Sequence, residues 1–284
     1  MENIMKKFKT ALIALATAVP ALAFSLPSQA SMSPYMETAL VDVCKAAMSN
    51  KVYKLSSTTK SYRLKDKTIA LKVMCNGDDI IAFAEKHGAD RTAAKLQKSI
   101  DKRNALVNAT IELVNNSGFH ATAMSKIAKM ANVSPATIYL YFESKQDLVN
   151  QTYIEVKEEY TKYAFATYNE NMTVEKGFEI IWKRIAKFKL NDCKNAMFLT
   201  QCDSTPMVDE LSRQQGLKHL QPLLDLWERG QQKGIIKQIS PYLLYAYTVA
   251  PLSFLMTIQQ RGDFQLNETH LNDAYQAAWN SIKV

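Results

Sequence analysis

The sequence predicts a mainly α-helical protein, in which a small α+β module precedes two all-helical regions. The 284 residues include only 8 Gly and 8 Pro, which favours long helices over a many-stranded sheet. Apolar residues recur at helical spacing along most of the chain after residue 100, whereas the clearest alternating stretch, residues 68–75, is short. The length suggests about two domains, and a content of 47% hydrophobic and 22% charged residues is that of soluble globular proteins.

The net charge of +8 is distributed unevenly along the chain. Residues 31–99 carry 12 basic and 7 acidic side chains, residues 100–149 carry 5 and 4, and residues 150–284 carry 15 of each. A basic excess favours contact with polyanions, but overall charge is only a weak indication of nucleic-acid binding. The charge therefore does not by itself locate a functional site.

The N-terminal segment, residues 1–30, has the three parts of an export signal. Three lysines lie between residues 6 and 9, an uncharged apolar run covers residues 10–24, and Ser28 and Ala30 provide small residues for cleavage. The apolar run is shorter than the roughly 20 residues that span a bilayer as a helix, and we expect no stable membrane span in the rest of the chain. An amphipathic or buried core helix is the alternative.

Residues 31–98 predict a small module. Ser33 and Pro34 are suited to begin a helix, residues 68–75 alternate as a strand that Asn76-Gly77 ends, and residues 78–88 form another short helix. Cys44 and Cys75 are either a disulfide, which export would permit, or two buried free thiols. Residues 1–98 resemble small secreted bacterial proteins of unknown function, through the signal, "LVDVCKAA", "ALKVMCNGDDIIAFAEKHGA" and the two cysteines.

Residues 99–149 carry the most informative motif. A first helix is expected to begin after Ser99 and to end at Gly118, and a short second helix covers residues 122–131. Asn132 tolerates a left-handed turn, and Ser134-Pro135 then begins a third helix, whose Ile138 and Phe142 face the core. Two short helices joined by a three-residue turn make a helix-turn-helix, and its second helix fits the major groove of DNA.

The segment "GFHATAMSKIAKMANVSPATIYLYFESKQDLV" closely resembles the DNA-binding domain of TetR-family transcriptional regulators, with Asn132 where glycine is usual. The resemblance implies a DNA-binding regulator, a repressor released by an effector. It places Ser125, Pro135, Ala136 and Tyr141 where bases are approached, and Thr122, Thr137, Tyr139 and Lys145 where phosphates are held. Core packing is the alternative for the aromatic residues.

Residues 150–284 predict at least five further helices, which form the effector-binding and dimerisation domain of such a regulator. By architectural resemblance, residues 241–260 and 268–282 pair with a second subunit, so we expect a homodimer and a roughly palindromic operator. Apolar residues of the middle helices are candidates for the wall of a pocket for an unknown small hydrophobic effector, although each also fits a plain core role. They are Phe178, Trp182, Met197, Phe198, Cys202, Tyr245 and Phe254.

The sequence predicts no catalytic or metal site and no cofactor. The four histidines are scattered, Cys193 and Cys202 fit buried free thiols better than a redox pair, and no acid/base pair or nucleophile stands out. An enzyme is therefore not expected.

An export signal and an operator-binding domain contradict each other in localisation, since a regulator acts in the cytoplasm and the signal directs a chain to the periplasm. Three interpretations remain open: two joined reading frames, a true fusion with an inefficient signal, or an exported protein whose helical half no longer regulates. The last would be a disulfide-bonded envelope protein, and only export would oxidise Cys44 and Cys75.

Overall fold

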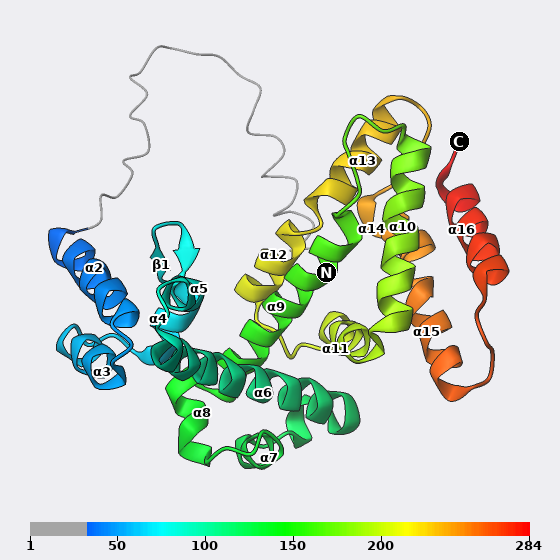
Figure 1. Cartoon of the computed structure of the whole chain (residues 1–284). Coiled ribbons are helices and arrows are strands. Elements are labelled where there is room, and N and C mark those ends of the chain that lie inside the picture. The colour runs from blue at the N-terminus through cyan, green and yellow to red at the C-terminus, as the bar shows by residue number, and fades with distance from the viewer. Residues whose placement is uncertain (1–32) are drawn as a thin grey trace, which may run out of the picture.

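The computed structural model describes residues 33–284, so the signal expected in residues 1–30 lies outside the described residues. Within this part of the chain helices predominate, and two strands of two residues each form a single antiparallel sheet (Figure 1). The mainly α-helical fold with a small α+β module at the N-terminal end is confirmed.

The N-terminal module has its own small core. Its elements are α2 (Pro34–Met48), α3 (Val52–Ser61), α4 (Asp66–Lys72), β1 (Met74–Cys75), β2 (Asp78–Asp79) and α5 (Ile80–Lys86). Ser33 caps α2 by accepting a hydrogen bond from Met36 N, as the Ser-Pro pair predicts. The core joins apolar side chains of these helices to the beginning of the next helix, through Ala93 and Leu96.

The strand predicted for residues 68–75 is wrong for most of its length. Residues 66–72 form helix α4, and only Met74 and Cys75 pair as a strand. Strand alternation would place Leu71 in the core, but Leu71 is exposed, while the adjacent Ile69 and Ala70 are both buried. Packing against neighbouring helices has therefore overridden a weak alternating pattern.

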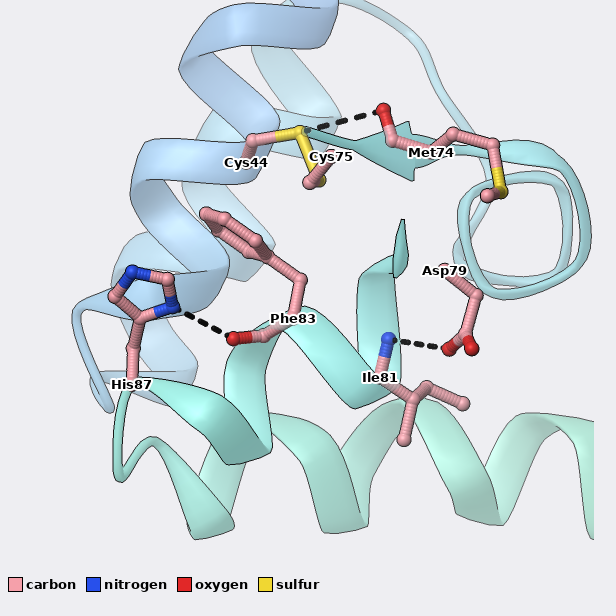
Figure 2. The surroundings of a disulfide bond; sticks show 7 residues. All are labelled: Cys44, Met74, Cys75, Asp79, Ile81, Phe83 and His87. Atoms are coloured by element: carbon pink, nitrogen blue, oxygen red, sulfur yellow. Dashed lines mark hydrogen bonds between the residues drawn. A yellow bond between two sulfur atoms is a disulfide. The ribbon is translucent and has the colours of Figure 1, made fainter. Parts of the chain in front are cut away.

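The disulfide between Cys44 and Cys75 is present and joins α2 to β1 (Figure 2). The Phe83 ring of α5 lies beside it, and Asp79 caps α5 by accepting hydrogen bonds from Ile81 N and Ala82 N. A module of this size has a marginal core, so a cross-link between its first helix and its sheet is a substantial part of its stability.

A single 32-residue helix, α6 (Asp90–Ala121), leads from the module into the rest of the protein (Figure 1). The helix start expected after Ser99 is wrong, because Ser99 lies inside α6. Residues 93–107 include no Gly or Pro, so nothing interrupts the helix there. Gly118 adopts φ of 75° and interrupts the helical backbone at the position where the sequence predicts the helix to end. Up to Leu96, the buried apolar side chains of α6 belong to the core of the module. From Leu106 onward, they belong to the core of the C-terminal region.

The C-terminal region continues with short helices α7 (Met124–Met130) and α8 (Pro135–Tyr141), which lie below α6 in Figure 1, and with the long α9 (Lys145–Phe165). The remaining helices pack above α6: α10 (Val174–Asn191), α11 (Cys193–Ser204), α12 (Glu210–Lys218), α13 (Gln221–Gln232), α14 (Pro241–Thr248), α15 (Pro251–Arg261) and α16 (Glu268–Ile282). One continuous core runs from α6 to α16.

One expected long helix is divided. The sequence predicts a helix from Thr205-Pro206 to Gly230 with Leu211 facing inward, but α12 begins only after Asp209, which caps it, and α13 follows a break near His219. Leu211 is exposed, and Gly230 lies buried inside α13 against Ile236. The buried residues of α12 are instead the small Ser212 and Gly216, and Gly216 packs on Tyr153 of α9.

The segment Pro241–Arg261 is long and apolar enough to cross a membrane by length and composition, with a mean hydropathy of 1.3. The expectation that no stretch after the N-terminal segment is long and apolar enough to span a membrane is therefore wrong. Within the segment, α14 and α15 are separate helices, and several large apolar side chains face outward. Among them are Tyr242, Leu243, Tyr247 and Phe254. The segment is thus an apolar surface of a helical domain, and length and composition alone do not make it a span.

Candidate DNA-binding site and sensor domain

The turn between α7 and α8 has the geometry that the sequence predicts. Asn132 adopts φ of 52°, and Val133 N donates to Ala128 O at 3.0 Å, which closes the turn. Ser134 caps α8 through Thr137 N at 3.3 Å, with Pro135 in the first turn. Ile138 anchors α8 in the core, so the opposite face of the helix stays free.

That free face is small, polar and aromatic. Pro135 and Ala136 are exposed, Thr137 is half-buried, and Tyr139 is 58% exposed. Leu140 is also exposed at 61%, which the sequence analysis missed because helical periodicity left its direction undecided. A short helix with small residues at its N-terminal end and an exposed tyrosine can enter a DNA groove without steric conflict.

Helix α7 adds exposed side chains next to this face. Ser125 is exposed, as expected for a residue that approaches DNA. Lys126 and Lys129 are exposed on the same short helix and were not predicted as contacts, although their charge was the available signal. The two lysines give the α7–α8 unit a local positive charge suited to phosphate.

Two of the expected DNA-contact side chains are instead buried, which corrects the prediction. Thr122 is 1% exposed, and its hydroxyl donates to Gly118 O at 2.8 Å, so it holds the end of α6. Tyr141 is 7% exposed, and its hydroxyl lies 3.1 Å from Ser99 Oγ. Tyr141 is drawn inward because α6 extends far enough to offer it a polar partner.

The N-terminal module contacts α8 directly. Lys67 Nζ of α4 donates a hydrogen bond to Tyr141 O, at the C-terminal end of α8. A cation at a helix C-terminus is stabilising because the last carbonyl groups carry partial negative charge. Burial lowers the pKa of Lys67, reinforced by nearby Lys65. The module therefore supports the end of α8 rather than standing apart from it.

Lys145 begins α9, the helix that follows α8. Ser144 accepts from Asp147 N at 3.0 Å, and Asp147 in turn accepts from Glu143 N at 2.8 Å, so the predicted cap forms. Lys145 Nζ donates to Phe119 O at 2.9 Å and lies 4.1 Å from the Phe119 ring centroid. Lys145 is thus half-buried and held in place beside the N-terminus of a 21-residue helix.

An ion pair fastens α6 to α9. Arg103 Nη1 donates to Glu155 Oε2 at 2.9 Å, and Nη2 donates to the other carboxylate oxygen, which makes the pair bidentate. The Arg103 guanidinium also lies 5.3 Å from the centroid of the Phe142 ring. Arg103 therefore links α6, the end of α8 and α9. Helix α9 begins the C-terminal helical region, residues 150–284, which we call the sensor domain after its predicted role.

The seven candidate pocket residues do not line one common pocket. Phe178, Phe198 and Cys202 are buried in the core, and Met197 is half-buried against it. Trp182 and the exposed Phe254 border a surface groove of about 230 Å³ between α14, α15 and α16. Tyr245 lines a separate small cavity. The aromatic and Met residues at helical spacing therefore serve mainly in core packing rather than as the wall of a pocket.

This cavity is small, about 10 Å³, and partly open to solvent, and it contains charged groups that were not predicted from the sequence. Lys157 of α9 and Lys189 of α10 line it, together with Tyr160, Tyr245 and the exposed Asp203. The available signal was their spacing: Lys157 lies four residues after Tyr153, and Lys189 lies four after Ile185, each on an apolar stripe.

The cavity alters the titration of its groups. Burial lowers the pKa of Lys189 to about 8, against the opposing effect of Asp203 and with a further lowering by Lys157. Burial raises the pKa of Tyr160 well above its ordinary value, and also that of Tyr245. No group of three or more His, Cys, Asp or Glu side chains within residues 33–284 is placed to hold a metal ion.

The free cysteines lie in the helical domain. Cys202 is buried and Cys193 is half-buried, and they are not bonded to each other. Burial raises the pKa of the Cys202 thiol, reinforced by Asp203. A buried thiol of raised pKa is unreactive, as expected from the sequence.

Three family models match different parts of the chain. Residues 43–107 match a family of proteins of unknown function (DUF3718), residues 106–152 match bacterial regulatory proteins of the tetR family, and residues 174–283 match the tetracyclin repressor-like C-terminal domain. The first match covers most of the module, and the other two cover the helix-turn-helix and the sensor domain.

Relatives of known sequence match the C-terminal two-thirds. An uncharacterised HTH-type transcriptional regulator of Haemophilus influenzae is 24% identical over 188 residues, 66% of this chain and 98% of the relative. The fatty acid metabolism regulator protein of Bacillus subtilis is 27% identical over 136 residues, 47% of this chain and 70% of the relative. A crystal structure of a TetR family transcription regulator from Marinobacter aquaeolei is similar with a TM-score of 0.62 and 26% identity, covering 66% of this chain and 98% of that one.

Proposed function

Because residues 106–283 belong to the TetR family of bacterial transcriptional regulators, we propose that this chain is a sequence-specific DNA-binding repressor that a small-molecule effector releases. The observation that carries the proposal is the exposed face of α8, held on a helix-turn-helix whose turn and caps are all formed. A regulator of this kind works in the cytoplasm, so we propose that the working protein is cytoplasmic.

We assign two kinds of DNA contact to the exposed residues. Ser125 on α7, and Pro135 and Ala136 at the N-terminal end of α8, are exposed and approach base edges. Tyr139 and Lys145 contact phosphates, and Thr137 joins them from its half-buried position. Phosphate contacts fix the position of the protein and give most of the salt dependence, whereas base contacts specify the sequence. Thr122 and Tyr141 are left out because their side chains are buried.

We propose a homodimer formed through α14, α15 and α16. Supporting this, α14 and α15 present outward-facing Tyr247 and Phe254 beside an apolar groove against α16. A contiguous apolar surface of this kind is unusual on a monomer and suits an interface between copies. The nearly neutral charge of residues 100–149 also favours two DNA-binding units acting together, since one unit makes few phosphate contacts. Two such units would read a roughly palindromic operator.

Release of DNA would follow if the effector prefers a conformation in which the two α8 helices are wrongly spaced. Helix α9 is suited to transmit such a change, because it begins directly after α8 and continues into the sensor domain. The relative named as a regulator of fatty acid metabolism supports an effector with an apolar part.

Fluorescence anisotropy on the full chain tests this function, using duplexes selected by the protein from random sequence. Tyr139→Ala combined with Lys145→Ala should weaken binding to every duplex, because two phosphate contacts per subunit are lost. Loss of the Lys145 charge should also make the dependence on salt shallower. Lys218→Ala, an exposed lysine on α12, is the matched control. Selection of no preferred duplex would refute the proposed function.

A further inference from the structure

Two lysines are buried in the sensor domain without a carboxylate partner. Lys157 is 3% exposed and Lys189 is 6% exposed. Within residues 33–284, neither ammonium has a carboxylate oxygen within 4.0 Å. Buried charges are ordinarily paired, because an uncompensated charge in the interior is costly.

The groups around the two ammonium groups do not balance their positive charge. Lys157 Nζ lies 5.9 Å and 5.7 Å from the ring centroids of Tyr153 and Tyr160. Lys189 Nζ donates one hydrogen bond, at 3.0 Å, to Ser253 Oγ, a neutral acceptor. Asp203 faces the same cavity, but it is exposed to solvent and is a single negative charge against two positive ones. The cavity therefore keeps a net positive charge.

A third polar group adds an independent observation. Tyr160 lines the same cavity, and its Oη is buried without any hydrogen-bond partner among the described residues. Buried hydroxyl groups nearly always have a partner. Two ammonium groups and a tyrosine hydroxyl are all hydrogen-bond donors, and one small cavity brings all three together.

We propose that this cavity is the headgroup site for an acidic effector, in which Lys157, Lys189 and Tyr160 bind the anionic head of an amphipathic small molecule. An acidic head supplies the acceptors and the negative charge that the three donors lack. The neighbouring Phe188, Leu199 and Tyr245 suit an apolar tail. This inference deepens the proposed function and rests on it for the regulatory role of the site.

The position of the site connects it to both ends of the regulator. Lys157 is on α9, whose first residues follow α8, and Ser253, the partner of Lys189, is on α15 of the proposed dimer interface. The cavity, at about 10 Å³, holds one water molecule at most. A headgroup therefore fits only if α9 and α10 separate, and this movement would pull on the DNA-binding unit and favour the released conformation.

Isothermal titration calorimetry on the full chain tests the site with three probes: sodium octanoate, octyl phosphate and neutral octanol. We expect octanoate or octyl phosphate to bind, the stronger of the two identifying the headgroup, and octanol to bind at least about tenfold more weakly. Lys157→Met and Lys189→Met should each weaken binding of the acidic probe by about tenfold or more. The exposed lysines Lys162→Met and Lys187→Met, on the same two helices, are the matched controls and should bind normally.

Thermal stability without any probe gives a second measurement. Removing an uncompensated buried charge should leave the melting temperature of Lys157→Met and Lys189→Met equal to or above that of the unmodified chain. Equal affinity for octanol and the acidic probes, no binding by either acidic probe, or a marked fall in melting temperature for both variants would overturn the proposal. DNA binding is measured separately, so a chain that binds its operator but no acid retains the proposed function and loses only this site.

Discussion

Replacing Arg103 by Met should destabilise the protein and loosen α6 from α9. Arg103 makes a bidentate ion pair with Glu155, hydrogen bonds to Gln151 and lies over the Phe142 ring. Its side chain is 8% exposed, while that of Glu155 is 41% exposed. The carboxylate is therefore rehydrated when Arg103 is removed, and the cost stays below the roughly 3–5 kcal/mol of breaking a fully buried pair.

The expected magnitude follows from the contacts that are lost. A charge-assisted hydrogen-bonded pair contributes about 1.5–3 kcal/mol, and a cation–π contact adds about 0.5–1 kcal/mol. Since Met keeps much of the apolar packing, we expect a loss of about 2–3 kcal/mol. For a domain of this size, that corresponds to a fall in melting temperature of roughly 4–12 °C.

Urea unfolding followed by circular dichroism measures the effect, in a double-mutant cycle with Glu155→Gln. The two changes should be non-additive by about 1 kcal/mol or more, because each removes the same interaction. Arg91 is an exposed arginine near the N-terminal end of α6, and Arg91→Met serves as the control, which should change the stability little. Additivity within about 0.3 kcal/mol would show that the pair does not fasten the two helices.

Three further predictions concern other contacts of the fold. Gly216→Ala should destabilise the protein by about 1–3 kcal/mol in urea unfolding, because a Cβ there would lie 2.6 Å from the buried Tyr153 ring; no change would refute the packing of α12 on α9. Cys75→Ser should lower the free energy of unfolding of the module by about 2–4 kcal/mol and increase the cleavage of the module by trypsin. Unfolding followed by tryptophan fluorescence should stay unchanged, because all three tryptophans lie beyond residue 180. The pKa of Lys189 is lowered to about 8, so its protonation opposes folding below pH 8 and this cost is relieved as the pH rises toward 10.5. The free energy of unfolding of the unmodified chain, relative to that of Lys189→Met, should therefore rise between pH 8 and 10. A difference that stays constant over this range would contradict the prediction. The other titratable groups that face the cavity are Lys157, Asp203, Tyr160 and Tyr245.

Local signals were the part of the fold that the sequence predicted well. The Ser134-Pro135 start of α8, the left-handed Asn132 and the kink at Gly118 each depend on the backbone preferences of one or two residues. Such preferences act within a few residues, so they can be recognised without knowledge of the rest of the chain. The exposed face of α8 followed from them, because Ile138 fixed which side of the helix is buried.

Long-range packing was the part that the sequence could not show. Tyr141 was expected at the surface, but it turns inward because α6 continues through Ser99 and places a hydroxyl beside it. Segment 68–75 alternates like a strand, yet residues 68–72 belong to helix α4, which packs against α6. Lys157 and Lys189 were missed because lysine is normally a surface residue, and only the structure shows that both end in one cavity.

The central claim, that the chain binds a specific operator through α8, is tested most directly by chromatin immunoprecipitation from cells that make the full chain. Ala136→Glu, which places a negative charge on the exposed face of α8, is the comparison. We predict enrichment of a few discrete genomic sites that share a roughly palindromic sequence, and loss of that enrichment with Ala136→Glu. No enriched site, with the chain recovered only outside the cytoplasm and beginning near Ser31, would contradict the claim and favour an exported protein instead.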